Sequence, residues 1–154
     1  MVIDDLNAIA EKEQAARKKT IIRCCMAAGC MSSNSETVKK NLEQAVKDAG
    51  LGDEVEVRGV GCMKLCCEGP LVSVDTQDAL YEKVTPEDAL ELVKTLKGGK
   101  TKVKRGDFNH PFFKKQLSIV LTNSGEIDPE RIEAYIAADG YQALHHVLRE
   151  LTPK

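Results

Sequence analysis

The sequence has little net charge, no long apolar run and no secretory signal. No stretch approaches the roughly 20 apolar residues that a helix needs to span a bilayer. Residues 1–20 are charged and contain no apolar core followed by small residues, so we expect a cytoplasmic protein. A formal net charge of −2 argues against a nucleic-acid binder, which usually shows a basic stripe.

Several catalytic and binding motifs are also absent. The sequence contains no Gly-x-Gly-x-x-Gly nucleotide fingerprint, and no Ser/His/Asp set or paired-carboxylate site stands out. It contains no Cys-x-x-Cys, the spacing that thiol–disulfide chemistry and most zinc ribbons use. A chain of 154 residues is long enough for one domain with a substantial core, plus an appendage.

What the sequence does have is six cysteines in two clusters. The first cluster is "RCCMAAGC", residues 23–30, and the second is "GCMKLCCEGP", residues 61–70. Structural disulfides are uncommon in a reducing cytosol. The cysteines therefore indicate metal or redox chemistry.

The hydrophobic pattern predicts an alternation of strands and helices. Ser33 and Glu36 have the spacing of a capping box, and Thr85 followed by Pro86 is typical of a helix start. In the helix after Pro86 we expect a buried face of Ala89, Leu90, Val93 and Leu96. The expected elements are helix 4–18, strand 20–23, helix 33–50, strand 55–60, a hairpin over 71–84 and helix 86–97.

This order defines an α/β fold. A strand–helix–strand unit should have a right-handed crossover and two parallel strands. Adding a hairpin and a helix gives a thioredoxin-like arrangement, β-α-β then β-β-α. Each cysteine cluster follows one of the two parallel strands, and the carboxyl ends of such strands lie at one edge of the sheet. We therefore expect the two clusters to converge in space.

Four thiolates from two loops suit an iron–sulfur cluster or a zinc ion. The possible pairs are Cys25 or Cys24 with Cys30, and Cys62 with Cys66 or Cys67. These gaps are wider than the two residues of a zinc knuckle, which favours a [2Fe–2S] cluster. Zinc, thiol–disulfide chemistry and plain buried thiols remain open at this point.

In each doublet, one cysteine should face the site and the other should face away, because successive strand residues point to opposite faces. We expect the cysteine of each doublet that faces away from the site to behave as a small buried hydrophobe. Lys64 is either solvated or stabilises a negative cluster, and Pro70 is either cis or trans. The histidines, His110, His145 and His146, are expected to have structural or surface roles.

Beyond residue 98 the character of the sequence changes. We divide the chain into an N-terminal helix over 1–19, the α/β domain over 20–98, and a linker and mostly helical extension over 99–154. The basic, Gly-rich segment 97–107 is expected to be a linker. In the extension, Asp128 is expected to cap a helix that ends at Gly140, and 141–151 form a second helix. The extension has few apolar residues and should pack on something larger.

The sequence resembles a known family. "CCMAAGC", "GVGCMKLCCEGPLVSVD" and "LYEKVTPEDA" resemble the thioredoxin-like [2Fe–2S] ferredoxin domain of the diaphorase subunits of bidirectional, NAD(P)-linked nickel–iron hydrogenases. These subunits are related to the NADH-binding flavoprotein and [2Fe–2S] subunits of respiratory complex I. "NHPFFKKQLSIVLTNSGEIDPERIEAYIAADGYQAL" resembles the segment that enters the flavin domain of the same subunit.

The resemblance implies that Cys25, Cys30, Cys62 and Cys66 bind one [2Fe–2S] cluster, and that Cys24 and Cys67 are not ligands. Relatives in complex I often have glycine where this chain has Lys64. The resemblance also implies an electron-transfer module that passes single electrons between a flavin and other iron–sulfur carriers. A zinc-stabilised docking domain without redox function is the alternative.

In this family the flavin (FMN) loop, the NAD(P) pocket and a [4Fe–4S] site follow the segment that ends this sequence. We therefore expect an N-terminal fragment that is not an enzyme alone. The expected partners are the remainder of its flavoprotein subunit, neighbouring iron–sulfur subunits of a hydrogenase complex, and ferredoxin. No nucleic acid and no membrane span are expected.

Overall fold

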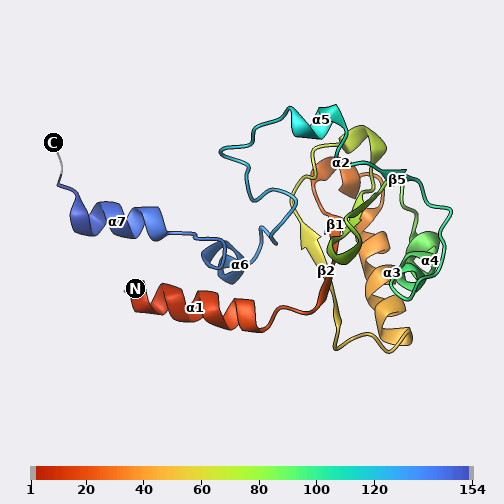
Figure 1. Ribbon diagram of the computed structural model, residues 1–154, viewed down its shortest axis with the longest axis horizontal. Helices are drawn as coiled ribbons and strands as arrows, with labels where there is room; N and C mark the ends of the chain where they lie inside the picture. Colours follow the sequence, from red (N-terminus) through yellow and green to blue (C-terminus); the bar gives the residue numbers. More distant parts are fainter. Residues whose placement is uncertain (1–2, 153–154) are drawn as a thin grey trace. The chain divides into compact units, whose positions relative to one another are not determined.

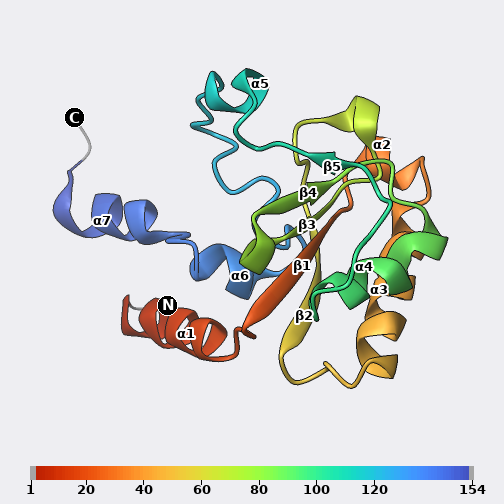
Figure 2. The same ribbon diagram turned by 45° about the vertical axis from the view of Figure 1, so that its right-hand side comes forward.

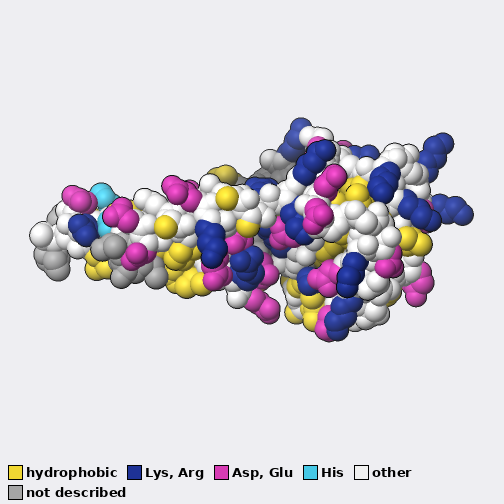
Figure 3. All heavy atoms as spheres, turned by 90° about the horizontal axis from the view of Figure 1, so that it is seen from below, with side chains coloured by type: hydrophobic (Ala, Val, Ile, Leu, Met, Phe, Trp, Pro, Cys, Tyr) yellow, Lys and Arg dark blue, Asp and Glu magenta, His cyan; other side chains and the backbone are white. Residues whose placement is uncertain are grey.

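The computed structural model describes residues 3–152 and divides the chain into two compact units (Figure 1). The larger unit is Lys18–Glu126, and the smaller unit joins the chain up to Arg17 with the chain from Ile127 onward. None of the helices in the described part is long and apolar enough to cross a membrane. Figure 3 shows basic and acidic side chains intermixed over one face of the molecule, consistent with the low net charge.

A five-stranded sheet forms the centre of the larger unit, in the order β2-β1-β3-β4-β5 (Figure 2). β1 and β2 are parallel, and every other neighbouring pair is antiparallel. The predicted thioredoxin-like α/β arrangement is therefore confirmed. The strands are β1 (Thr20–Cys25), β2 (Val55–Val60), β3 (Val72–Val74), β4 (Ala79–Tyr81) and β5 (Arg105–Gly106).

Two helices cover one face of this sheet and pack against each other: α3 (Ser35–Asp48) and α4 (Ala89–Thr95) (Figure 2). α3 buries Val38, Leu42 and Val46, whose spacing of three to four residues places them on one side of a helix. These side chains belong to the larger of two hydrophobic cores, which also contains Cys24.

The helix starts differ in part from expectation. The Ser33–Glu36 capping box was wrong: α3 begins after Asn34, which adopts a left-handed φ of 71° and makes no side-chain cap. Ser33 instead follows a short helix, α2 (Ala28–Met31), that was not predicted. Its hydroxyl donates to the carbonyl of Gly29 in that helix.

The cap before α4 is confirmed. Thr85 and Asp88 form a capping box around a 3-10 turn, η3 (Pro86–Asp88). The predicted buried face was partly wrong, since Leu90 is 50% exposed and Leu92 is 1% exposed. The 3-10 turn winds more tightly than an α-helix, which rotates the residues that follow it relative to an ideal helical pattern.

A smaller hydrophobic core lies around the ends of the cysteine-bearing strands. Its buried members include Cys25, Val60 and Leu80, and Phe108 and Phe113 pack against it. Phe113 belongs to α5 (Pro111–Lys114), a turn of helix in the expected linker and extension region. The core buries Cys25, Cys30, Val60, Met63, Leu71 and Leu80.

After α5 the chain carries large apolar side chains at the surface. Leu117, Ile119, Val120 and Leu121 are 87%, 77%, 93% and 62% exposed. The larger unit continues through this segment to Glu126.

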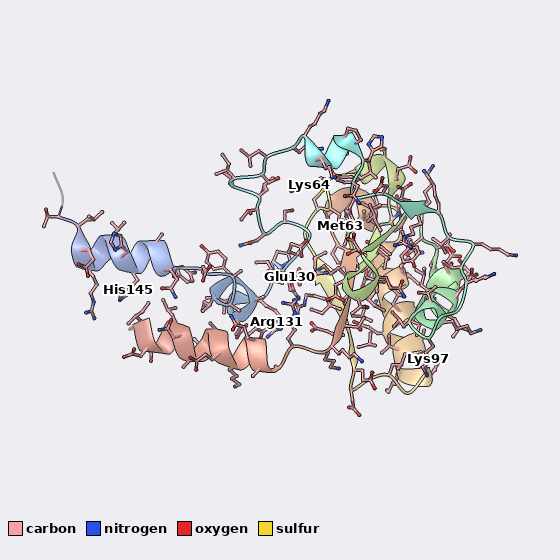
Figure 4. All side chains as sticks on the ribbon, in the orientation of Figure 1. Met63, Lys64, Lys97, Glu130, Arg131 and His145 are labelled. Atoms are coloured by element: carbon pink, nitrogen blue, oxygen red, sulfur yellow. The ribbon has the colours of Figure 1, made fainter. Side chains whose placement is uncertain are left out.

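The smaller unit consists of α1 (Ile3–Ala15), α6 (Ile132–Ile136) and α7 (Gln142–Glu150). α1 packs against α6, and Arg131 forms two hydrogen bonds of 2.8 Å with the carboxylate of Glu13 (Figure 4). The expected cap at Asp128 was wrong, because α6 begins later, after Arg131. Asp128 instead accepts a hydrogen bond from the backbone of Glu130.

Candidate metal centre

The two cysteine clusters follow the paired ends of β1 and β2. Cys25 ends β1 and lies opposite Val60, the last residue of β2. Cys62 follows only two residues later. The parallel register therefore brings the start of the second cluster beside the end of the first, as the sequence predicted.

The first pair of thiols is buried. Cys25 is 0% exposed and Cys30, in α2, is 1% exposed. Interaction with the Cys30 side chain favours the thiolate of Cys25 and lowers its pKa, while the same interaction and burial raise the pKa of Cys30. The thiolate is the form of cysteine that binds a metal.

The second pair lies nearer the surface. The sulfur atoms of Cys62 and Cys66 are 3.6 Å apart, with Cys62 partly buried and Cys66 exposed at the start of a 3-10 turn, η1 (Cys66–Glu68). The hydrogen bond to Cys62, followed by its charge, raises the pKa of Cys66. The backbone N–H of Lys64 donates to the sulfur of Cys62 over 3.3 Å.

The loop between Cys62 and Cys66 has an unusual backbone. Lys64 has a φ of 70°, in the left-handed region that favours glycine. The Lys64 ammonium donates to the hydroxyl of Ser118 over 2.6 Å, so this lysine is not simply solvated (Figure 4).

Glycines allow the two loops to approach closely. A Cβ atom at Gly29 would lie 3.4 Å from Cβ of Cys66, and one at Gly69 would lie 2.8 Å from the sulfur of Cys30. The charge on Cys66 also contributes to the raised pKa of Cys30. The four sulfurs therefore gather at one place. The peptide bond between Gly69 and Pro70 is cis, the first of the two open alternatives.

The remaining two thiols have different surroundings. Cys24 is 0% exposed, its thiol donates to the carbonyl of Ser35 over 3.6 Å, and burial raises its pKa to about 12. The expectation of a small buried hydrophobe is confirmed for Cys24. It was wrong for Cys67, which is exposed in the 3-10 turn η1.

His110 has a structural role, as the sequence predicted for the histidines. His110 is the N-cap of α5 and accepts a hydrogen bond from the backbone of Phe112 through Nδ1. Sequence reasoning missed Ser118 and Ser124, which contact the second cysteine loop. Isolated serines in an irregular segment give no periodic or motif signal that would have identified them.

The arrangement fits a two-iron cluster. The sulfurs form one buried pair, Cys25 and Cys30, and one pair nearer the surface, Cys62 and Cys66. A [2Fe–2S] cluster is held by four cysteine thiolates, two on each iron, whereas a structural zinc ion needs four ligands around one point.

An α/β fold with four thiols gathered at one sheet edge defines a class of iron–sulfur electron carriers. A comparison with protein families matches residues 11–97, more than half of this chain, to the thioredoxin-like [2Fe–2S] ferredoxins. The chain belongs to that family. It is thus an electron-transfer domain whose cofactor is a [2Fe–2S] cluster.

Individual relatives agree with this assignment. The chain is 32% identical over 66 residues to a 2Fe-2S ferredoxin of Clostridium pasteurianum, a match covering 43% of this chain and 65% of that relative. The chain therefore spans somewhat less than two thirds of the length of this curated relative.

Two solved structures of the thioredoxin-like [2Fe–2S] ferredoxin from Aquifex aeolicus are similar in fold. The wild-type crystal structure has a TM-score of 0.50 and 26% identity, and the match covers 56% of this chain and 93% of that chain. The other has a TM-score of 0.51 and 28% identity, with 59% and 96% covered.

Proposed function

We propose that Cys25, Cys30, Cys62 and Cys66 bind the [2Fe–2S] cluster in this chain. The convergence of one buried pair of sulfurs and one pair nearer the surface, at the ends of β1 and β2, carries this proposal. When bound, the cluster would supply reversible one-electron chemistry.

The residues around the sulfurs act by position and exposure. Cys25 and Cys30 anchor the site in the smaller core, away from water. Cys66 is exposed, so the second loop is the side on which a redox partner can approach. The Lys64 N–H donates to Cys62, and hydrogen bonds to sulfur ligands are one way in which proteins tune the potential of such centres.

For the setting of this electron carrier, we propose the N-terminal module of the diaphorase subunit of a bidirectional, NAD(P)-reducing nickel–iron hydrogenase. The support is the resemblance of residues 109–144, which lie outside the family match, to the segment that enters a flavin domain. The proposed partners are the flavin-bearing part of such a subunit, neighbouring iron–sulfur subunits and ferredoxin. All six cysteines are free, in keeping with our proposal of a reducing cytoplasm.

Electron paramagnetic resonance of anaerobically purified protein, before and after dithionite, tests the proposed ligands and cofactor. Iron and zinc are assayed on the same sample. We expect a signal only after reduction, with about two irons per chain. One zinc per chain and no signal would instead support the zinc-stabilised docking domain.

The hydrogenase setting needs a separate test. Tagged protein would be isolated from its native cells under anaerobic conditions, and its associated chains identified. We expect iron–sulfur and nickel–iron hydrogenase subunits. Consistent isolation with the [4Fe–4S] and membrane subunits of a respiratory complex, and with no hydrogenase chains, would contradict the proposed setting.

A further inference from the structure

A segment far along the chain holds the second cysteine loop. We call residues 117–125 the strap. The hydroxyl of Ser124 donates to the backbone carbonyl of Cys62 over 2.8 Å. At the other end of the strap, Ser118 accepts the hydrogen bond from the Lys64 ammonium. The strap therefore forms hydrogen bonds with the loop at two residues, Cys62 and Lys64.

Small residues permit this close approach. A Cβ atom at Gly61 would lie 3.3 Å from the hydroxyl oxygen of Ser124. Gly125 has a φ of +83°, and a Cβ there would lie 3.3 Å from the carbonyl oxygen of Cys62. A side chain at position 125 would therefore be strained in its backbone and crowded against the loop.

The second loop is also held by Met63, which is buried in the smaller core. Between β2 and η1 it forms neither helix nor strand, and it contains the left-handed residue Lys64. Beside it lies a cavity of about 190 Å³, lined by Met63, Lys64, Phe113 and Ser124 among others. On the side of this cavity, the two hydrogen bonds to the strap add to the packing of Met63 in holding the loop.

We propose that Ser124 and Ser118 are positioning residues that fix the Cys62–Cys66 loop for cluster binding. The strap lies beyond residue 97, where the family match ends. The two hydrogen bonds of Ser118 and Ser124 to the loop, which we call the brace, are therefore an addition to the matched ferredoxin domain. Ser124 fixes the backbone of Cys62, and Ser118 fixes Lys64, whose N–H bonds the Cys62 sulfur. The inference rests on the proposed role of Cys62 and Cys66 as ligands.

The strap has one set of side chains that contacts the cysteine loop and another that is exposed to solvent. Ser118 and Ser124 contact the cysteine loop, whereas Leu117, Ile119 and Val120 are more than three quarters exposed. Removal of one hydroxyl therefore takes away a contact with the loop and leaves the apolar surface unchanged. This makes serine substitutions a selective test of positioning.

The test compares Ser124→Ala and Ser118→Ala with Thr122→Ala in the full chain. Thr122 is exposed on the same strap and its hydroxyl makes no hydrogen bond to any described residue, so it is a matched control. Three quantities are measured: the rate of iron release to an excess chelator, the midpoint potential, and amide hydrogen exchange over residues 61–67 in cluster-free protein.

We expect Ser124→Ala to release iron on the order of 10-fold faster than the wild type, as outer-shell substitutions typically do for metal sites. Its midpoint potential should shift, and residues 61–67 should exchange faster. Ser118→Ala should follow in the same direction, Thr122→Ala should match the wild type, and Ser124→Thr, which keeps the hydroxyl, should restore slow release.

Equal release rates, potentials and exchange in Ser124→Ala and Thr122→Ala would overturn the proposal. Circular dichroism and the thermal midpoint of each variant exclude a general loss of fold as the cause. If the wild type holds no two-iron cluster, the proposed ligand assignment fails. Hydrogen exchange in cluster-free protein would still show whether the strap fixes the loop.

Discussion

Cys24 and Cys25 are neighbours in β1, yet their side chains lie in different hydrophobic cores. Cys24 belongs to the larger core with α3 and α4, and Cys25 belongs to the smaller core beside the second cysteine loop. The strand backbone alternates its side chains between the two faces of the sheet. Only one of two adjacent thiols can therefore reach the metal centre from this strand.

This separation predicts different outcomes for the two cysteines. Cys25→Ser should abolish or strongly alter the reduced-state electron paramagnetic resonance signal, because it removes a proposed ligand. Cys24→Ser should leave the signal nearly unchanged, because its side chain faces the other core. Loss of the signal in Cys24→Ser alone would mean that the wrong member of this doublet was assigned.

The second doublet should behave differently when its proposed ligand is removed. Cys67 is exposed in the short turn η1, next to Cys66, and no sheet fixes it to one face. In Cys66→Ser, we expect Cys67 to replace the missing ligand and an altered cluster signal to persist. The double variant Cys66→Ser/Cys67→Ser should lose it.

The control for this prediction is the first doublet, Cys24 and Cys25, which lies in β1. Cys25→Ser retains Cys24, but β1 is paired on both sides, with β2 and β3, so Cys24 cannot rotate toward the site. Iron content and the signal are compared across the three variants. Rescue in Cys25→Ser, or none in Cys66→Ser, would contradict this account.

The two cores should differ in their effect on the metal centre. Leu42→Ala and Leu80→Ala each remove a fully buried side chain, so each should lower the free energy of unfolding by about 2–5 kcal/mol. Leu80 lies in the smaller core with Cys25 and Cys30, and Leu42 lies in the larger one. Urea unfolding gives the stability, and chelator-driven iron release gives the effect on the site.

Only Leu80→Ala should speed iron release from the folded protein. The comparison is made in a range of urea concentration where both variants remain folded. Equal release from the two variants would show that the site responds to global stability and not to its local packing.

The larger unit should fold and bind its cluster without the rest of the chain. A protein of residues 18–126 retains the sheet, both cores and the strap. A protein of residues 18–97, cut at the end of the family match, lacks β5, Phe108, Phe113 and both serines of the brace. We expect the first to hold about two irons and the second to lose iron readily.

Size-exclusion chromatography, circular dichroism and iron assays on the two proteins check this prediction. Equal iron retention in both would show that residues 98–126 are dispensable for the site. Failure of residues 18–126 to fold would show that the division into two units is not a division into independent folding units.

The sequence predicted most of the sheet and the convergence of the cysteines because both follow from strong local signals. Alternating Val55 and Val57 marked β2, and the doublet at the end of β1 marked the site. The strand β5 gave no such signal, since Arg105 and Gly106 are polar or small and pair with β4 only in the folded chain. The buried face of α4 was shifted because the turn at 86–88 winds as a 3-10 helix.

The surroundings of the site were less predictable than its ligands. Ser118 and Ser124 lie 54 and 62 residues from their partners in the second loop, so no local pattern connects them. The exposure of Cys67 depends on the 3-10 turn η1, whereas the reasoning from alternation assumed an extended chain. Residue types and spacing identify candidate ligands, while contacts over long sequence separations determine what holds them.

The exposed apolar side chains of the strap have a consequence for the purified protein. Residues 117–121, "LSIVL", combine aliphatic and β-branched side chains with no charge and no proline, and four of the five are 62–93% exposed. Short segments of this composition readily form intermolecular β-structure. We therefore expect self-association through this segment to limit the concentration at which the chain stays dispersed, and we expect a single charged residue within the segment to raise that limit.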